Sequence, residues 1–439
     1  MQRMSQGSAP NVPRPMQHLP SAPHTDYSTP MAIPPPTPET ARFRRKRETI
    51  LDAAAALINQ HGARGMTLAH VAQAVGLNTT SVTYYFKRKE QLAAACYDRT
   101  MARLEAIAEA AAGEADPRAR VRHFLHGHMM LQARIRRGEE RAVTVLSDLR
   151  AMDGPDREAL GARFTGILRL VRGFFGPPAD AAAKALFTAR AHVLMESVLW
   201  LPAWLFRYFV DDFDRVEARL FAVFDHGIAP AGARWAPAAV PLDAAQPDAA
   251  DPAHQFLVAA TRLINERGYR GASVERIASE LGVTKGSFYH HLDAKDDLVV
   301  ACFRHSFLTL SRAQRAADAA GGNQWDRLSA TIALLLEIQL GEEGPLLRTT
   351  ALQALPPEMR MRVVERSNRI ARRFAGTMID GISEGSIRAI DPLIAAQALM
   401  VTLNAAYELR GWARGMAPGE AVAVYASTLA TGLFDPVRG

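Results

Sequence analysis

Two short stretches of small, hydrogen-bonding side chains, one in each half of the chain, have the residue types best suited to recognising a nucleic acid. The set in the first half is Asn78, Thr79, Thr80, Ser81, Thr83 and Tyr84. The set in the second half is Thr284, Lys285, Gly286, Ser287, Tyr289 and His290. A helix that enters a major groove about 12 Å wide needs such small, polar or basic side chains on its exposed face. Both stretches therefore predict contact with base edges of duplex DNA.

Cationic side chains flank the first stretch on both sides. The upstream run that we assign to DNA contact is Arg44, Arg45, Lys46 and Arg47. Downstream, Lys89 follows two further cations, and Lys295 stands at the equivalent place in the second half. Cations that neutralise backbone phosphates release condensed counterions, which gives affinity that falls with salt. The small polar residues between the cations would then supply base recognition.

The elements that must position these side chains are short helices joined by glycine turns. In the second half, a helix over about 253–267 ends at Gly268, and Ser273 is a plausible N-cap for a helix to about 281. A glycine at 282 permits a tight turn, after which Thr284 can cap a third helix. In the first half Thr67 caps the equivalent helix and Gly76 makes the turn. Each half therefore predicts a helix-turn-helix.

The two halves are copies of one another. At an offset of 206 residues Asn59 falls on Asn265 and Cys96 on Cys302, and no gap is needed between residues 57 and 96. Glycines and apolar positions keep the same frame across this window. A repeat of this length indicates domain duplication rather than a solenoid.

The segment from 282 to 298, GVTKGSFYHHLDAKDDL, resembles the recognition helix and following helix start of TetR/AcrR-type transcriptional regulators. The segment from 76 to 92, GLNTTSVTYYFKRKEQL, is a more divergent version. The resemblance implies that Tyr289 and Lys295 contact phosphate and that His290 faces the groove. Lys89 matches Lys295, whereas Thr83 and Thr80 replace the Tyr and Gly usual in the family, which implies altered geometry or weaker binding in the first copy.

The predicted fold class is all-α, because apolar residues recur at spacings of three and four and long alternating runs are missing. We expect two tandem TetR-like units, each with an N-terminal three-helix helix-turn-helix domain and a C-terminal helical ligand and dimerisation domain. The predicted boundaries are a disordered Pro-rich tail (1–40), a first helix-turn-helix domain (41–95), a first ligand domain (96–228), a linker (229–252), a second helix-turn-helix domain (253–301) and a second ligand domain (302–439).

The C-terminal part of each half carries aromatic and methionine residues suited to a pocket for an apolar effector. The candidates are Phe164, Phe174, Trp200, Trp204, Trp325, Met378 and Trp412, although such residues at helical spacing are more often core. Apolar helices at 184–201 and 213–228, and at 393–409 and 422–434, predict a four-helix interface. Burial of these helices within each half is the alternative.

The composition limits the class of protein to which this chain can belong. Of 439 residues, 48% are hydrophobic and 22% are charged, which is typical of a globular protein. The formal charge of +7 permits a polyanionic partner without requiring one, and two cysteines exclude a disulfide framework. No uncharged apolar stretch reaches 18 residues and no secretory signal is recognisable, so we expect a cytoplasmic protein with no membrane partner.

No sequence pattern indicates catalysis. A phosphate-binding glycine loop, a nucleophile elbow and a paired-carboxylate motif are all missing, so we expect no catalytic residue and no cofactor. His123, His126 and His128 lie close in sequence, but their spacing does not place all three on one helix face, and no metal site is predicted.

The sequence thus predicts a ligand-responsive regulator of transcription, with repression as the expected sign. Its partners would be double-stranded DNA and an unknown small-molecule effector, in an intramolecular pseudo-dimer or a homodimer. Because the two reading stretches differ, we expect an asymmetric operator. The alternative is a helical small-molecule-binding or scaffolding protein in which one or both helix-turn-helix units no longer read DNA.

Overall fold

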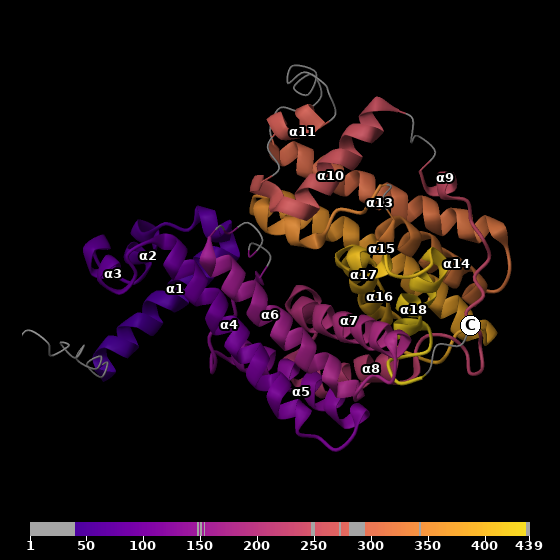
Figure 1. Cartoon of the computed structure of the whole chain (residues 1–439), viewed down its shortest axis with the longest axis horizontal. Helices are drawn as coiled ribbons and strands as arrows, with labels where there is room; N and C mark the ends of the chain where they lie inside the picture. Colours follow the sequence, from indigo (N-terminus) through magenta and orange to yellow (C-terminus); the bar gives the residue numbers. More distant parts are fainter. Residues whose placement is uncertain are drawn as a thin grey trace, which may run out of the picture. The chain divides into compact units, whose positions relative to one another are not determined.

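The computed structural model describes residues 40–146, 149, 152, 154–246, 251–271, 274–280, 295–341 and 344–435. Helices are the only regular secondary structure in these ranges, which confirms the all-α prediction (Figure 1). The chain divides after Arg44 into two units, and the packing reported below is that within Arg45–Gly439. The predicted Pro-rich tail lies outside the described residues.

The first half consists of long helices that follow a short helix-turn-helix. Its elements are α1 (Ala41–Gly65), α2 (Leu68–Ala74), α3 (Thr79–Tyr85), α4 (Lys89–Ala112), α5 (Pro117–Arg137), α6 (Pro155–Arg172), η2 (Gly173–Phe175), α7 (Ala181–Leu205), η3 (Val210–Asp212) and α8 (Phe213–His226).

Over its described residues the second half has a similar series of helices, after a short helix in the predicted linker. Its elements are α9 (Leu242–Ala245), α10 (Pro252–Gly271), α11 (Val274–Glu280), α13 (Lys295–Ala320), α14 (Gln324–Leu340), η4 (Thr349–Ala354), α15 (Pro357–Glu384), α16 (Pro392–Ala405), η5 (Ala406–Leu409), α17 (Arg410–Ala413) and α18 (Pro418–Ala430).

Equivalent residues of the two halves make equivalent contacts. The Cys96 thiol lies 3.6 Å from the Leu51 carbonyl oxygen, and the Cys302 thiol lies 3.8 Å from that of Leu257. Gly62 and Gly268 interrupt α1 and α10 at the same backbone angles, with φ of 71° in both. The duplication read from sequence is therefore present in three dimensions.

Four helices join the halves, at the positions that the sequence indicated, although α8 is amphipathic rather than apolar throughout. Helices α7 and α8 pack against α16 and α18 (Figure 1). Two backbone hydrogen bonds also connect the halves, just beyond the end of α8. Ile228 N–H donates to the Leu429 carbonyl at 2.8 Å, and Ala229 N–H donates to the Ala430 carbonyl at 2.9 Å. A side chain at Gly227 would place its Cβ 2.2 Å from the Ala430 carbonyl oxygen, so only glycine fits at this contact.

The described part of the predicted linker, residues 229–246, contains a helix and buried contacts that its composition does not indicate. Helix α9 packs on α13, and Gln246, only 5% exposed, donates from its side-chain amide to the Gly344 carbonyl at 3.1 Å. A single helical turn of four residues is too short to leave a periodic apolar pattern, which explains why sequence reading missed it.

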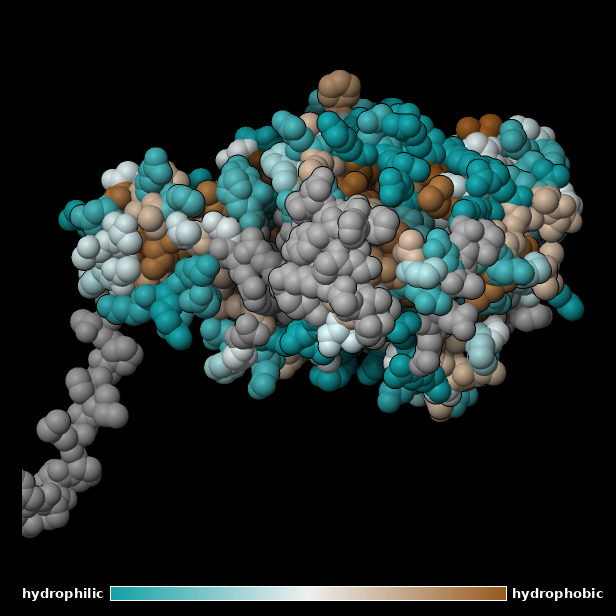
Figure 2. Space-filling view, turned by 90° about the horizontal axis from the view of Figure 1, so that it is seen from above, coloured by the Kyte–Doolittle hydropathy of each residue, from teal (hydrophilic) through white to brown (hydrophobic). Residues whose placement is uncertain are grey.

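Hydrophilic side chains cover most of the face seen in Figure 2, and hydrophobic ones form small separate groups. Among the helices of the described ranges, none is long and apolar enough to cross a lipid bilayer.

Candidate functional site

The first helix-turn-helix forms from local signals. The Thr67 hydroxyl accepts the His70 N–H at 3.1 Å and caps α2, and Gly76 makes the turn at a φ of 66°. The Asn78 side chain accepts the Ser81 N–H at 2.7 Å and caps α3. The predicted Thr67 cap and Gly76 turn are therefore present in this copy, whereas the Asn78 cap was not predicted.

Helix α3 presents the predicted polar side chains to solvent. Val82 is fully buried and anchors the helix, while Tyr84 is 66% exposed. The remaining members of the set are exposed at positions 78, 79 and 80 and half-buried at Ser81 and Thr83. The Thr83 hydroxyl donates to the Thr80 carbonyl at 2.9 Å, so contact with a phosphate oxygen, which also needs a donor, would require this bond to break.

The flanking cations are accessible. Arg44, Arg45 and Lys46 are exposed, and Arg47 is half-buried with its guanidinium 5.3 Å from the Phe86 ring centroid. Lys89 is the first residue of α4.

Most of the second reading set lies outside the described residues. This applies to Ser273, Thr284, Lys285, Gly286, Ser287, Tyr289 and His290. Lys295 is the first residue of α13, and its side chain is also outside the description. Helix α11, which would precede the turn, buries Ile277 and Ala278.

A cavity of about 280 Å³ lies between the two halves, with walls from both. Of the seven predicted pocket residues, Phe164 and Trp200 line it. Four others are core residues instead: Phe174, Trp204, Trp325 and Met378 are at most 7% exposed. The Trp412 ring packs beside the Tyr425 ring, with 6.3 Å between the two ring centroids. These large apolar side chains fill the core because a protein interior is close-packed and leaves little space unfilled.

The cavity wall carries four ionisable side chains that matter for its chemistry: His128, Glu196, Arg348 and Glu408. Burial lowers the pKa of His128 to about 3, so this imidazole is neutral. Arg348, only 5% exposed, forms an ion pair with Glu408. The two histidines close to His128 in sequence each contact a carboxylate elsewhere, His123 at Glu114 and His126 at Glu217.

A loop that lines the cavity is hydrogen-bonded to the first helix-turn-helix domain. The Asn59 amide on α1 donates to the Val143 carbonyl and accepts the Val145 N–H, both at 2.9 Å. The Thr144 N–H donates to the Thr100 hydroxyl on α4 at 2.9 Å. The loop 143–145 is thus attached to α1 and α4 at once, and all three of its residues line the cavity.

The second half builds the same three contacts from equivalent residues. The buried Asn265 amide on α10 donates to the Leu346 carbonyl and accepts the Arg348 N–H, both at 2.9 Å. The Leu347 N–H donates to the Ser306 hydroxyl on α13 at 2.8 Å. We call these two sets the asparagine clamps. Sequence reading matched Asn59 with Asn265 but assigned them no role, because their partners lie 81–86 residues away.

Family comparisons match three segments. A family described as bacterial regulatory proteins, tetR family, matches residues 50–96 and again residues 256–302. A second family, described as tetracyclin repressor-like, C-terminal domain, matches residues 321–409.

Curated relatives match part of the chain. The Transposon Tn10 TetC protein of Escherichia coli is 36% identical over 58 residues, which are 13% of this chain and 29% of the relative. The HTH-type transcriptional regulator BetI of Brucella canis is 34% identical over 80 residues, 18% of this chain and 40% of the relative. The HTH-type transcriptional repressor KstR2 of Rhodococcus jostii is 28% identical over 42% of this chain and 91% of the relative.

Solved structures align over a similar share. PfmR from Thermus thermophilus, described as a TetR family transcriptional regulator, is 24% identical, covers 41% of this chain and 98% of its own, and has a TM-score of 0.34. AibR in complex with isovaleryl coenzyme A and operator DNA is 20% identical, covers 40% of this chain and 96% of its own, and has a TM-score of 0.32.

Proposed function

Since the chain belongs to the TetR family of bacterial regulatory proteins and carries the amino-terminal segment of that family twice, we propose that it is a ligand-responsive DNA-binding regulator of transcription. The observation that carries this proposal is α3, whose buried Val82 holds a row of exposed small polar side chains between cationic flanks. Such a helix suits the major groove. KstR2 is named a repressor, and we propose the same sign here.

The two reading units would act as one pseudo-dimer within a single chain. The packing of α7 and α8 on α16 and α18 supports this arrangement, because it joins the halves through the elements that a family dimer is expected to use. The reading stretches at 78–84 and 284–290 differ at almost every exposed position. The operator would then hold two unlike half-sites, with centres about one helical turn or a small multiple of a turn apart.

The cavity between the halves would hold the effector. Its walls include both clamped loops, 143–145 and 346–348, so an effector that displaces a loop pulls on α1 or α10 through an asparagine clamp. Helices α4 and α13 contribute wall residues as well, including Thr100 and Ser306 of the clamps. The response can be no larger than the difference in effector affinity between the DNA-competent and released states.

Fluorescence anisotropy with the chain's own upstream DNA across a salt series tests DNA recognition. We expect a sequence-preferring complex whose logarithmic affinity falls linearly with the logarithm of salt concentration. Lys89→Ala and Lys295→Ala should each weaken binding and flatten that slope by about one unit.

Lys184→Ala, which removes a lysine at the start of α7, is the matched control and should leave the slope unchanged. An unchanged slope in both Lys89→Ala and Lys295→Ala would show that the phosphate contacts are wrongly assigned. A wild-type chain that shows no preference for any sequence would instead support a small-molecule-binding protein with inactive helix-turn-helix units.

A further inference from the structure

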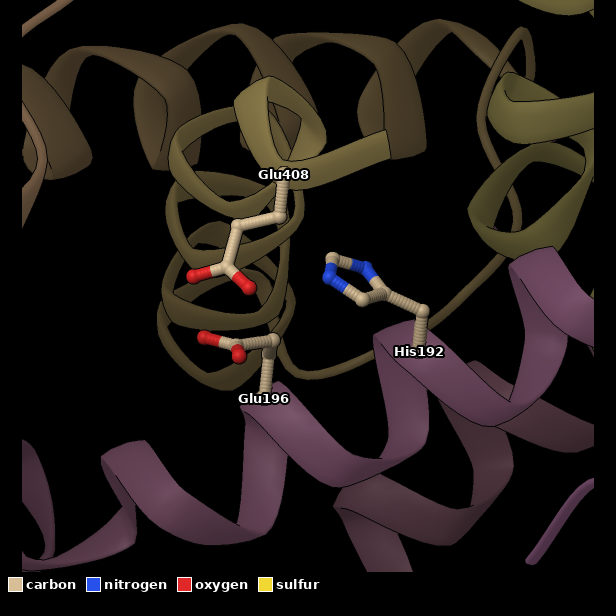
Figure 3. A group of neighbouring side chains, drawn as sticks. All are labelled: His192, Glu196 and Glu408. Carbon is tan, nitrogen blue, oxygen red and sulfur yellow. The ribbon is translucent and has the colours of Figure 1, made fainter. Parts of the chain in front are cut away.

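Three potential metal ligands from the two halves meet beside the cavity. His192 and Glu196 lie on α7, and Glu408 lies in η5 (Figure 3). One ligand atom of each residue lies within 4.8 Å of the others. The spacing of four residues puts His192 and Glu196 on the same helix face, and the packing of the halves brings Glu408 opposite them.

Hydrogen bonds on the far side of His192 orient its ring. A carbonyl oxygen can only accept, so the Tyr425 hydroxyl donates its proton to the Thr402 carbonyl at 3.3 Å. The Tyr425 oxygen is then left to accept from His192 Nδ1, 3.2 Å away.

This arrangement fixes the imidazole tautomer. With the proton on Nδ1, a neutral His192 presents the Nε2 lone pair, and Figure 3 shows the outer ring nitrogen turned toward the carboxylates of Glu196 and Glu408. A metal-bound histidine commonly donates its other N–H to such a partner, which sets the ring orientation.

The orientation and net charge of the two carboxylates also favour a cation. Arg348 pairs with one oxygen of Glu408, Oε1, and so orients this carboxylate. The half-buried Glu196 and Glu408 together with the buried Arg348 sum to one negative charge at the cavity wall. Charges removed from water are costly unless they are compensated, so a bound cation would stabilise this cluster.

We propose that His192, Glu196 and Glu408 bind a divalent transition-metal ion of the zinc or manganese class. One imidazole and two carboxylates suit these ions, and bonds of about 2.0–2.2 Å to zinc need only small side-chain rotations from the present spacing. Because Glu196 and Glu408 also line the cavity, the remaining coordination positions face it. The ion would tie α7 of one half to η5 of the other. This inference does not depend on DNA binding.

Cobalt(II) titration of the full chain, stripped of metal with a chelator, tests the site through the visible absorption of the bound ion. We expect one ion per chain, displaced by Zn²⁺. Glu196→Gln keeps the side-chain shape at a half-buried position and should lower the affinity by at least about 10–100-fold, since loss of even an outer contact costs that much. His192→Ala should do the same.

Glu217→Gln is the matched control, because it alters the other pair in which a glutamate contacts a histidine on a neighbouring helix, at 2.8 Å from His126. Its Co²⁺ affinity should equal that of the wild type. If His192→Ala does not fold, the Co²⁺ affinity of Glu196→Gln alone tests the site. The proposal is overturned if the wild type binds no ion stoichiometrically, if Glu196→Gln binds as tightly as the wild type, or if Glu217→Gln loses the ion as well.

Discussion

Removal of the second asparagine clamp should loosen the cavity loop by an amount that can be worked out from its contacts. Asn265 is 3% exposed and makes two bonds of 2.9 Å, to the Leu346 carbonyl and the Arg348 N–H. Asn265→Ala leaves both buried backbone groups without this partner. An unsatisfied buried polar group costs about 1–3 kcal/mol, so with two such groups the loop should lose about 2–6 kcal/mol of local stability.

Hydrogen–deuterium exchange of the Arg348 amide measures this loss directly. Since about 1.4 kcal/mol corresponds to a tenfold change, exchange should accelerate by about 30- to 20,000-fold. Asn59→Ala removes the same two contacts in the first half, but Val145 is 37% exposed and water can replace the side chain there. The Val145 amide should therefore change by only about 1–2 kcal/mol.

Asn368→Ala is the control, because Asn368 contacts Arg207 and makes no bond to either clamped loop. It should leave Arg348 exchange unchanged. The account of the clamps is refuted if Arg348 exchanges at the wild-type rate in Asn265→Ala, or if Asn59→Ala has the larger effect.

Three further predictions follow from burial and backbone geometry. Burial raises the pKa of both Cys96 and Cys302 to about 12, so neither thiol should react with iodoacetamide at pH 8 until the chain is unfolded; native alkylation would contradict this. Gly227→Ala should lower the melting temperature more than Gly138→Ala. Both glycines have a positive φ, which costs any other residue about 1–2 kcal/mol, but only at Gly227 would the added Cβ also collide with a carbonyl oxygen, that of Ala430. Equal shifts in melting temperature would refute this close approach. Burial lowers the pKa of His128 to about 3 in the folded chain, whereas the same imidazole in the unfolded chain takes up a proton near pH 6.5. Below pH 6.5 the unfolded chain therefore binds one more proton than the folded chain, and the free energy of unfolding should fall as the pH drops. His128→Leu should reduce that fall between pH 6.5 and 5, as measured by denaturant unfolding at each pH; an unchanged fall would argue against a neutral buried imidazole.

Local signals made the helix-turn-helix predictable. The predicted Thr67 cap and Gly76 turn act within three residues of their own positions, so sequence alone fixes them. The Asn78 cap is equally local but was not predicted, because Asn78 was assigned only to DNA contact. The four-helix packing was also readable, because α7 and α16 are apolar around most of their surface and such helices must be buried on several sides.

Long-range relations were not readable in the same way. The asparagine clamps join residues more than 80 positions apart, and the ligand cluster joins α7 to η5 of the other half. Only packing decides which of many polar residues meet. Phe174 and Met378 lie in the core rather than in the cavity wall for the related reason that size and hydrophobicity suit either place.

The central claim is that one chain reads two unlike half-sites. Hydroxyl-radical footprinting of the operator complex, combined with its mass in solution, tests this most directly. We predict one chain per duplex, two protected half-sites of different sequence, and loss of protection at only one of them in Lys89→Ala. Two chains on a palindrome, with protection weakened equally at both half-sites by Lys89→Ala, would contradict the account.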